Sequence, residues 1–158
     1  MRKRHIVVIT LAIVLGLGFA FYPRIVNKLL PGADTAPASS AALIAQGQAI
    51  FQARCANCHG ADLEGQAHWR ERRPDGKLPA PPHDAGGHTW NYPDRVLFRT
   101  VKEGLFWVAG PNYKSDMPAF AGVLSDQEIN AVIAYIKSRW PDELRAHQQI
   151  IDQLDRQR

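Results

Sequence analysis

A hydrophobic run near the start of the chain predicts a membrane-spanning helix. Residues 6–22 are 17 positions without a charge or a proline. At a rise of about 1.5 Å per residue they span roughly 25 Å, at the short end for crossing a bilayer. The basic residues Arg2, Lys3 and Arg4 precede the run. Because positive flanks stay in the cytoplasm, residues 1–30 are predicted to anchor the chain in the membrane and export the rest.

A cleaved signal peptide is the alternative interpretation of this segment. Small residues at Gly18 and Ala20 suit cleavage after Ala20. The apolar pattern resumes at Ile25 and reaches Leu30, and this favours an uncleaved anchor. Both interpretations export the residues that follow.

The remaining pattern is helical, so the fold class is predicted to be all-α. Residues 31–42, rich in Ala, Pro and Ser, predict a flexible linker, and a helix follows that Ser39 or Ser40 can cap. Residues 94–104 predict a short helix that opens at Pro93 and ends at Gly104. Residues 105–120 show no such pattern and predict a loop.

Two more helices are predicted towards the end of the chain. Ser125 and Glu128 form a capping box that starts the clearest helix, and Pro141 stops it. Residues 141–158 predict a C-terminal helical extension with one thin apolar stripe. The stripe consists of Leu144, His147, Ile151 and Leu154. Such a helix either rests on the domain or frays in water, or else contacts a partner subunit.

Charge excludes one class of partner. The net charge is +4, but five of the 19 basic residues lie in the first 30 positions and all 15 acidic residues lie later. From residue 31 onward 14 basic and 15 acidic residues leave a net charge of −1. No basic surface of the kind that binds nucleic acid is therefore expected.

The candidate chemistry lies at Cys55-Ala56-Asn57-Cys58-His59, a C-x-x-C-H motif. Two thiols on one helical turn suit bonding to the two vinyl groups on one edge of a porphyrin, and the next histidine offers a neutral nitrogen to the iron. The chain has two cysteines, so the motif uses all its thiols. The sequence predicts one covalently bound haem c, attached through Cys55 and Cys58 and ligated by His59.

Two other interpretations of the motif are weaker. A thioredoxin-like redox C-x-x-C should follow a strand in a βαβ unit, and no strand pattern precedes Cys55. A structural zinc site needs four ligands, and a second C-x-x-C is absent.

Met117 is the predicted second axial ligand. It lies in the loop between two predicted helices, and Pro118 restrains its backbone. A methionine in a loop more commonly fills a gap against aromatic side chains such as Phe120. With His59 and Met117 as ligands, the iron would have no vacant position for a substrate and would only exchange electrons.

Residues 60–93 predict a long loop with five prolines and little periodicity. A loop of this length in a small domain is usually functional, and this one is expected to wrap one edge of the haem. It holds His68, His83 and His88. Each is more simply a surface residue than a metal ligand.

The chain resembles the class I, or mitochondrial-type, cytochromes c over residues 43–140. The resemblance rests on Cys55 to His59, on the run from Lys114 to Phe120 that contains Met117, and on the closing helix. It implies that the first and last helices of this domain cross, and Gly47, Phe51 and Tyr135 match the crossing positions. The loop over residues 65–92 is longer than a minimal member needs, and it resembles a subgroup of membrane-anchored bacterial monohaem cytochromes.

The resemblance also implies a proline whose carbonyl accepts a hydrogen bond from the ligand histidine. Such a partner fixes the tautomer of the ring and strengthens the ligand. Pro81 is the expected residue, with Pro79 as the alternative.

The leading hypothesis is an electron carrier rather than an enzyme, tethered to the bacterial inner membrane by a single helix with its haem domain in the periplasm. Its partners would be a respiratory reductase or dehydrogenase and a terminal oxidase. The alternative is the haem subunit of a periplasmic oxidoreductase, with a labile Met117 or with metal bound by His68, His83 or His88. A sensor or assembly factor is a third hypothesis, which only the C-terminal stripe supports.

Overall fold

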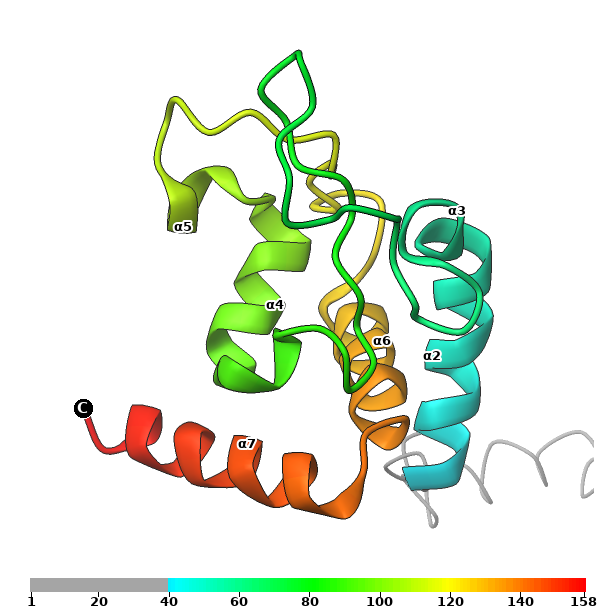
Figure 1. Ribbon diagram of the computed structural model, residues 1–158. Coiled ribbons are helices and arrows are strands. Elements are labelled where there is room, and N and C mark those ends of the chain that lie inside the picture. Colours follow the sequence, from blue (N-terminus) through cyan, green and yellow to red (C-terminus); the bar gives the residue numbers. More distant parts are fainter. Residues whose placement is uncertain (1–39) are drawn as a thin grey trace, which may run out of the picture. The chain divides into compact units, whose positions relative to one another are not determined.

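The computed structural model describes residues 40–158, and helices are the regular secondary structure of that part of the chain (Figure 1). The longer helices are α2 (Ser40–Arg54), α4 (Asp94–Glu103), α6 (Asp126–Ser138) and α7 (Asp142–Arg156). The shorter ones are α3 (Ala56–His59), α5 (Phe106–Ala109) and the 3-10 helix η1 (Thr89–Asn91). The prediction of an all-α domain is confirmed for these residues.

The predicted anchor over residues 1–30 and most of the predicted linker lie outside the described residues. Within residues 40–158, no helix is both long and apolar enough to cross a membrane. The predicted linker ran to residue 42, whereas α2 already begins at Ser40. That boundary is corrected by three residues, because Ala41 and Ala42 are good helix formers that composition had grouped with the linker.

Helices α2 and α6 cross closely, and a glycine makes the crossing possible. A Cβ at Gly47 would collide with the carbonyl oxygen of Ala131 and lie 2.9 Å from the Cβ of Tyr135. Next to this point the rings of Phe51 and Tyr135 pack with their centroids 5.5 Å apart. This crossing fixes the end of α2, where the cysteine motif begins.

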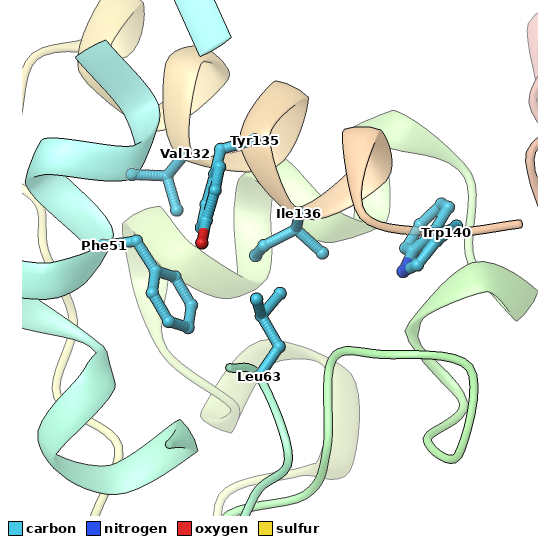
Figure 2. Packing of buried hydrophobic residues seen from close by; sticks show 6 residues of the cluster. All are labelled: Phe51, Leu63, Val132, Tyr135, Ile136 and Trp140. Carbon is cyan, nitrogen blue, oxygen red and sulfur yellow. The ribbon is translucent and has the colours of Figure 1, made fainter. Parts of the chain in front are cut away.

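The core lies between these two helices and the loop that follows the motif (Figure 2). Its fully or nearly fully buried members are Phe51, Leu63, Val132, Tyr135, Ile136 and Trp140. Burying side chains of this size stabilises the fold by about 1.5–3 kcal/mol each. Leu63 comes from the loop, so the loop over residues 60–93 is partly anchored in the core.

Several predicted helix ends are confirmed. Ser125 Oγ accepts a hydrogen bond from the Glu128 backbone N–H, and the Glu128 carboxylate accepts one from the Ser125 N–H at 2.8 Å. Helix α4 begins after Pro93 and ends before Gly104, whose φ of +77° is readily adopted only without a side chain.

The region over residues 105–120 was predicted as loop, and this is wrong at one place. Phe106–Ala109 form the short helix α5. A single turn of four apolar residues carries no periodicity, so the pattern did not reveal it.

Helix α7 runs along η1 and the start of α4, as an extension that rests on the domain (Figure 1). The predicted apolar stripe docks only in its first half: Leu144 packs against the core and the His147 ring meets Trp90 edge-on at 5.5 Å, whereas Leu154 is 55% exposed. The buried residues of α7 are instead Gln148 and Asp152. Gln148 donates to the Asp94 carboxylate at 2.8 Å, and Asp152 accepts from the Asp94 backbone N–H at 2.9 Å. Hydrogen bonds from buried polar groups therefore add to the apolar contact of Leu144.

Candidate functional site

The cysteine motif occupies one tight turn at the end of α2. The backbone N–H groups of Cys58 and His59 donate to the Cys55 carbonyl at 3.1 and 2.9 Å. Residues three positions apart on such a turn are neighbours, so both thiols lie on one side of it. Cys55 packs against the core and Cys58 is exposed, and both thiols are free.

The state of the first thiol argues against redox exchange. Burial, and then the neighbouring Cys58, raise the pKa of Cys55 to about 11. Reactive cysteines of disulfide oxidoreductases have lowered pKa values, because the thiolate is the nucleophile. A protonated, half-buried Cys55 suits a structural bond to a cofactor.

The His59 side chain is held as a neutral imidazole. It is buried, at 8% exposure for the residue, and its Nδ1 donates to the Pro81 carbonyl oxygen at 2.9 Å. A carbonyl only accepts, so the proton lies on Nδ1 and the lone pair of Nε2 is left for a metal. Burial lowers the pKa of His59, which keeps the imidazole uncharged, as a metal ligand must be. The proline whose carbonyl accepts from His59 is therefore Pro81, and not the alternative Pro79.

The loop histidines have three different environments. His68 is exposed and lies 3.4 Å from Glu71, and His88 packs near Trp69 with ring centroids 5.3 Å apart. His83 stacks on His59 itself, with ring centroids 4.1 Å apart. Within residues 40–158 no group of three or more His, Cys, Asp or Glu side chains is arranged to hold a metal ion. Sequence reasoning weighed His83 as a ligand and missed its contact with His59, for which the sequence carried no signal.

Met117 lies in an extended segment after α5 and is half-buried. Its backbone N–H donates to Ser115 Oγ at 3.0 Å. The neighbouring Asp116 is paired with Arg73 and Lys77, which close a turn of the long loop. The Met117 segment is therefore tied to the loop over residues 60–93.

The residues present fit a haem. Two thiols on one turn and a neutral imidazole with a free Nε2 form the donor set described above. In the described part of the chain, the buried indole N–H groups of Trp90 and Trp107 have no acceptor. Such donors suit an acceptor that the protein itself does not supply, and the carboxylates of a haem are acceptors of this kind.

Comparison with known proteins gives the family. The family model of cytochrome c matches residues 44–140, well over half of the chain. This chain belongs to the cytochrome c family. A curated relative is the cbb3-type cytochrome c oxidase subunit FixP of Rhizobium etli, 27% identical over 117 residues. The match covers 73% of this chain and 37% of the relative, so the chain spans little more than a third of that protein's length. No solved structure matches.

Family membership confirms the class I monohaem cytochrome c that the motif indicated. The protein carries one haem c, bound covalently through Cys55 and Cys58, and it transfers electrons. Haem iron supplies the chemistry by alternating between the ferrous and ferric states. The protein's own contribution is to hold the ligands, exclude water and shape the surroundings of the iron.

Proposed function

We propose that this cytochrome c is a one-electron carrier whose iron is ligated by His59 and Met117. The observation that carries the proposal is the hydrogen bond from His59 Nδ1 to the Pro81 carbonyl, which orients the free Nε2. Met117 completes the ligand set because it is the methionine of a restrained segment and is tied to the same loop as Pro81. A neutral thioether favours the ferrous state and raises the potential.

With His59 and Met117 as its ligands, the haem iron would have no free site for a substrate. His59 is nearly enclosed, whereas Cys58 is exposed, so the thioether edge of the haem would lie nearest to solvent. Electrons would enter and leave at this edge, in transient contacts with partner proteins. A domain with a net charge of −1 from residue 31 onward steers such partners weakly.

The test of ligation is an optical spectrum of the haem-loaded full chain, oxidised and reduced, with and without carbon monoxide. A sulfur-to-iron charge-transfer band and resistance to carbon monoxide are expected. Met117→Ala should lose the band, bind carbon monoxide and lower the potential, with the haem still attached. The control Val123→Ala changes an exposed side chain and should behave like the parent. A Met117→Ala variant with the parent's band and resistance would overturn the ligand assignment.

We also propose that residues 1–30 tether the carrier to the inner membrane, with the haem domain in the periplasm. Supporting this are the basic flank, the apolar run of residues 6–22 and the need to attach haem c in an exported compartment. A tether raises the local concentration of a membrane-bound partner. Expressed in a bacterium, the full chain should stay with carbonate-washed membranes and be digested by protease added to spheroplasts. Recovery in the soluble periplasm would show a cleaved signal peptide instead.

A second candidate function is that of a haem subunit in an oxidase complex. The relative FixP is a subunit of a cbb3-type cytochrome c oxidase, and this resemblance favours the idea. The partners would then be a permanent oxidase assembly rather than a separate reductase and oxidase. Purification in mild detergent distinguishes the two, since a subunit should co-purify with the oxidase in fixed stoichiometry and a carrier should not.

A further inference from the structure

The face of the His59 imidazole is covered by a second imidazole. The rings of His59 and His83 lie 4.1 Å apart between centroids, with an angle of 24° between their planes. This is a stacked arrangement, and the Phe51 ring meets His83 edge-on at 6.4 Å. His59 is therefore bounded on its Nδ1 edge by the Pro81 carbonyl and on one face by the His83 ring.

His83 is itself held by contacts from three separate segments. Its backbone N–H donates to the Leu63 carbonyl at 2.8 Å, and its carbonyl accepts from the Trp140 indole N–H at 2.7 Å. Its ring Nδ1 lies 2.7 Å from the hydroxyl oxygen of Thr89, which is buried. These contacts fix both the backbone position and the ring orientation of His83, so its ring presents a rigid face to His59.

A histidine suits this position better than an aliphatic side chain of similar size would. A planar ring matches the face of His59, and its nitrogen allows Thr89 to hold the plane. His59 Nδ1 donates its proton to the Pro81 carbonyl, so the stacked arrangement leaves the lone pair of Nε2 free for the iron.

We propose that His83 is a positioning residue for the haem, whose ring, held by Thr89, sets the plane of the His59 imidazole relative to the iron. The proposal rests on His59 as an iron ligand, as proposed above, but not on Met117. The Pro81 carbonyl fixes where the Nδ1 edge of His59 points, and the stacked ring fixes the tilt about that edge. Partners that orient a ligand in this way tune the metal.

The test compares variants of the haem-loaded full chain by two readouts. Proton NMR of the oxidised protein reports ligand orientation through the paramagnetically shifted haem methyl signals, and titration gives the midpoint potential. His83→Leu removes the planar face and should change both the methyl pattern and the potential. Thr89→Val keeps the shape of its side chain but frees the His83 ring, so it should move both readouts in the same direction by a smaller amount.

Two further variants distinguish positioning from packing. His83→Phe retains a planar ring and should restore much of the parent's methyl pattern. His68→Leu removes another histidine of the same loop, one that is exposed and lies 3.4 Å from Glu71, and should leave both readouts at the parent's values.

Parent-like readouts in both His83→Leu and Thr89→Val would overturn the proposal, as would an equal change in His68→Leu. If His83→Leu fails to acquire haem, the Thr89→Val result decides. Failure of the proposed ligand set appears separately, as a missing charge-transfer band in the parent protein.

Discussion

The two residues proposed to ligate the iron are held in contrasting ways. His59 is buried and contacts a backbone carbonyl and a stacked ring, next to the α2–α6 crossing. Met117 is half-buried in an extended segment. The adjacent Asp116 ties that segment to Arg73 and Lys77, and its carboxylate is 51% exposed. One side of the site is thus held by packing and the other by surface ion pairs.

This difference has a physical consequence. Contacts excluded from water are insensitive to salt, whereas exposed ion pairs are screened by it and contribute little each. The His59 side should therefore stay intact under conditions that loosen the Met117 side. We therefore expect the proposed bond from iron to the Met117 sulfur to be lost first, and the proposed bond to His59 to persist until the domain unfolds.

The largest expected effect comes from disturbing the packed side. Gly47→Ala places a methyl group against the Ala131 carbonyl, so α2 must shift away from α6. Overpacking of this kind costs about 1–3 kcal/mol or more, and urea unfolding of the haem-loaded protein should show the loss. Ala49→Ser, on the exposed face of α2, should change stability by less than about 0.5 kcal/mol. Equal stabilities for the two variants would mean that the crossing does not support the site.

A smaller effect is expected from weakening the ion pairs that hold the Met117 segment. Asp116→Asn removes the charge that pairs with Arg73 and Lys77, so the Met117 segment should separate from the iron more readily. The variant should bind more carbon monoxide than the parent, and added salt should shift the parent towards the variant. Glu103→Gln breaks a different exposed ion pair, with Arg99, and serves as the control. If Asp116→Asn resists carbon monoxide as the parent does, packing rather than charge holds Met117.

Helix α7 offers a change that should spare both sides of the site. Asp152 caps the start of α4 by accepting from the Asp94 N–H, and it is 7% exposed. Asp152→Ala should cost about 1 kcal/mol of unfolding free energy, as loss of a helix cap does. Asp152→Asn retains an acceptor oxygen and should restore most of it. Neither variant should move the midpoint potential, and a shift in it would show that α7 acts on the site.

The smallest expected effect is a pH dependence of α7 docking. Hydrogen bonds from Arg95, and then its charge, hold the pKa of Asp155 below its ordinary value of 3.8. The stabilisation is therefore complete above pH 3.8 and is lost as the pH falls through the lower folded pKa. The difference in unfolding midpoint between the Asp155→Asn variant and the parent should be constant from pH 7 to 5 and should shrink in stronger acid. A difference that persists in acid would show that charge is not its cause.

Features that involve residues close together along the chain were predicted from the sequence alone. The haem attachment motif, the capping box of Ser125 and Glu128 and the ends of α4 each involve residues a few positions apart. Local chemistry and helical periodicity determine these features, so the family and the cofactor followed from them. Gly47 and Phe51 were matched to the crossing through the family resemblance, and the structure places them there.

Local patterns in the sequence did not predict the contacts between distant segments, and Pro81 was expected only through the family resemblance. The Pro81 carbonyl lies 22 positions from His59 in the sequence, and Asp152 lies 58 positions from the N–H that it caps. The loop that brings Pro81 and His83 to His59 has no periodicity, and α7 docks partly by buried polar groups that an apolar pattern cannot reveal. The sequence by itself determined which chemistry this protein carries, and the folded chain decided which residues surround it, because those contacts depend on how irregular segments pack.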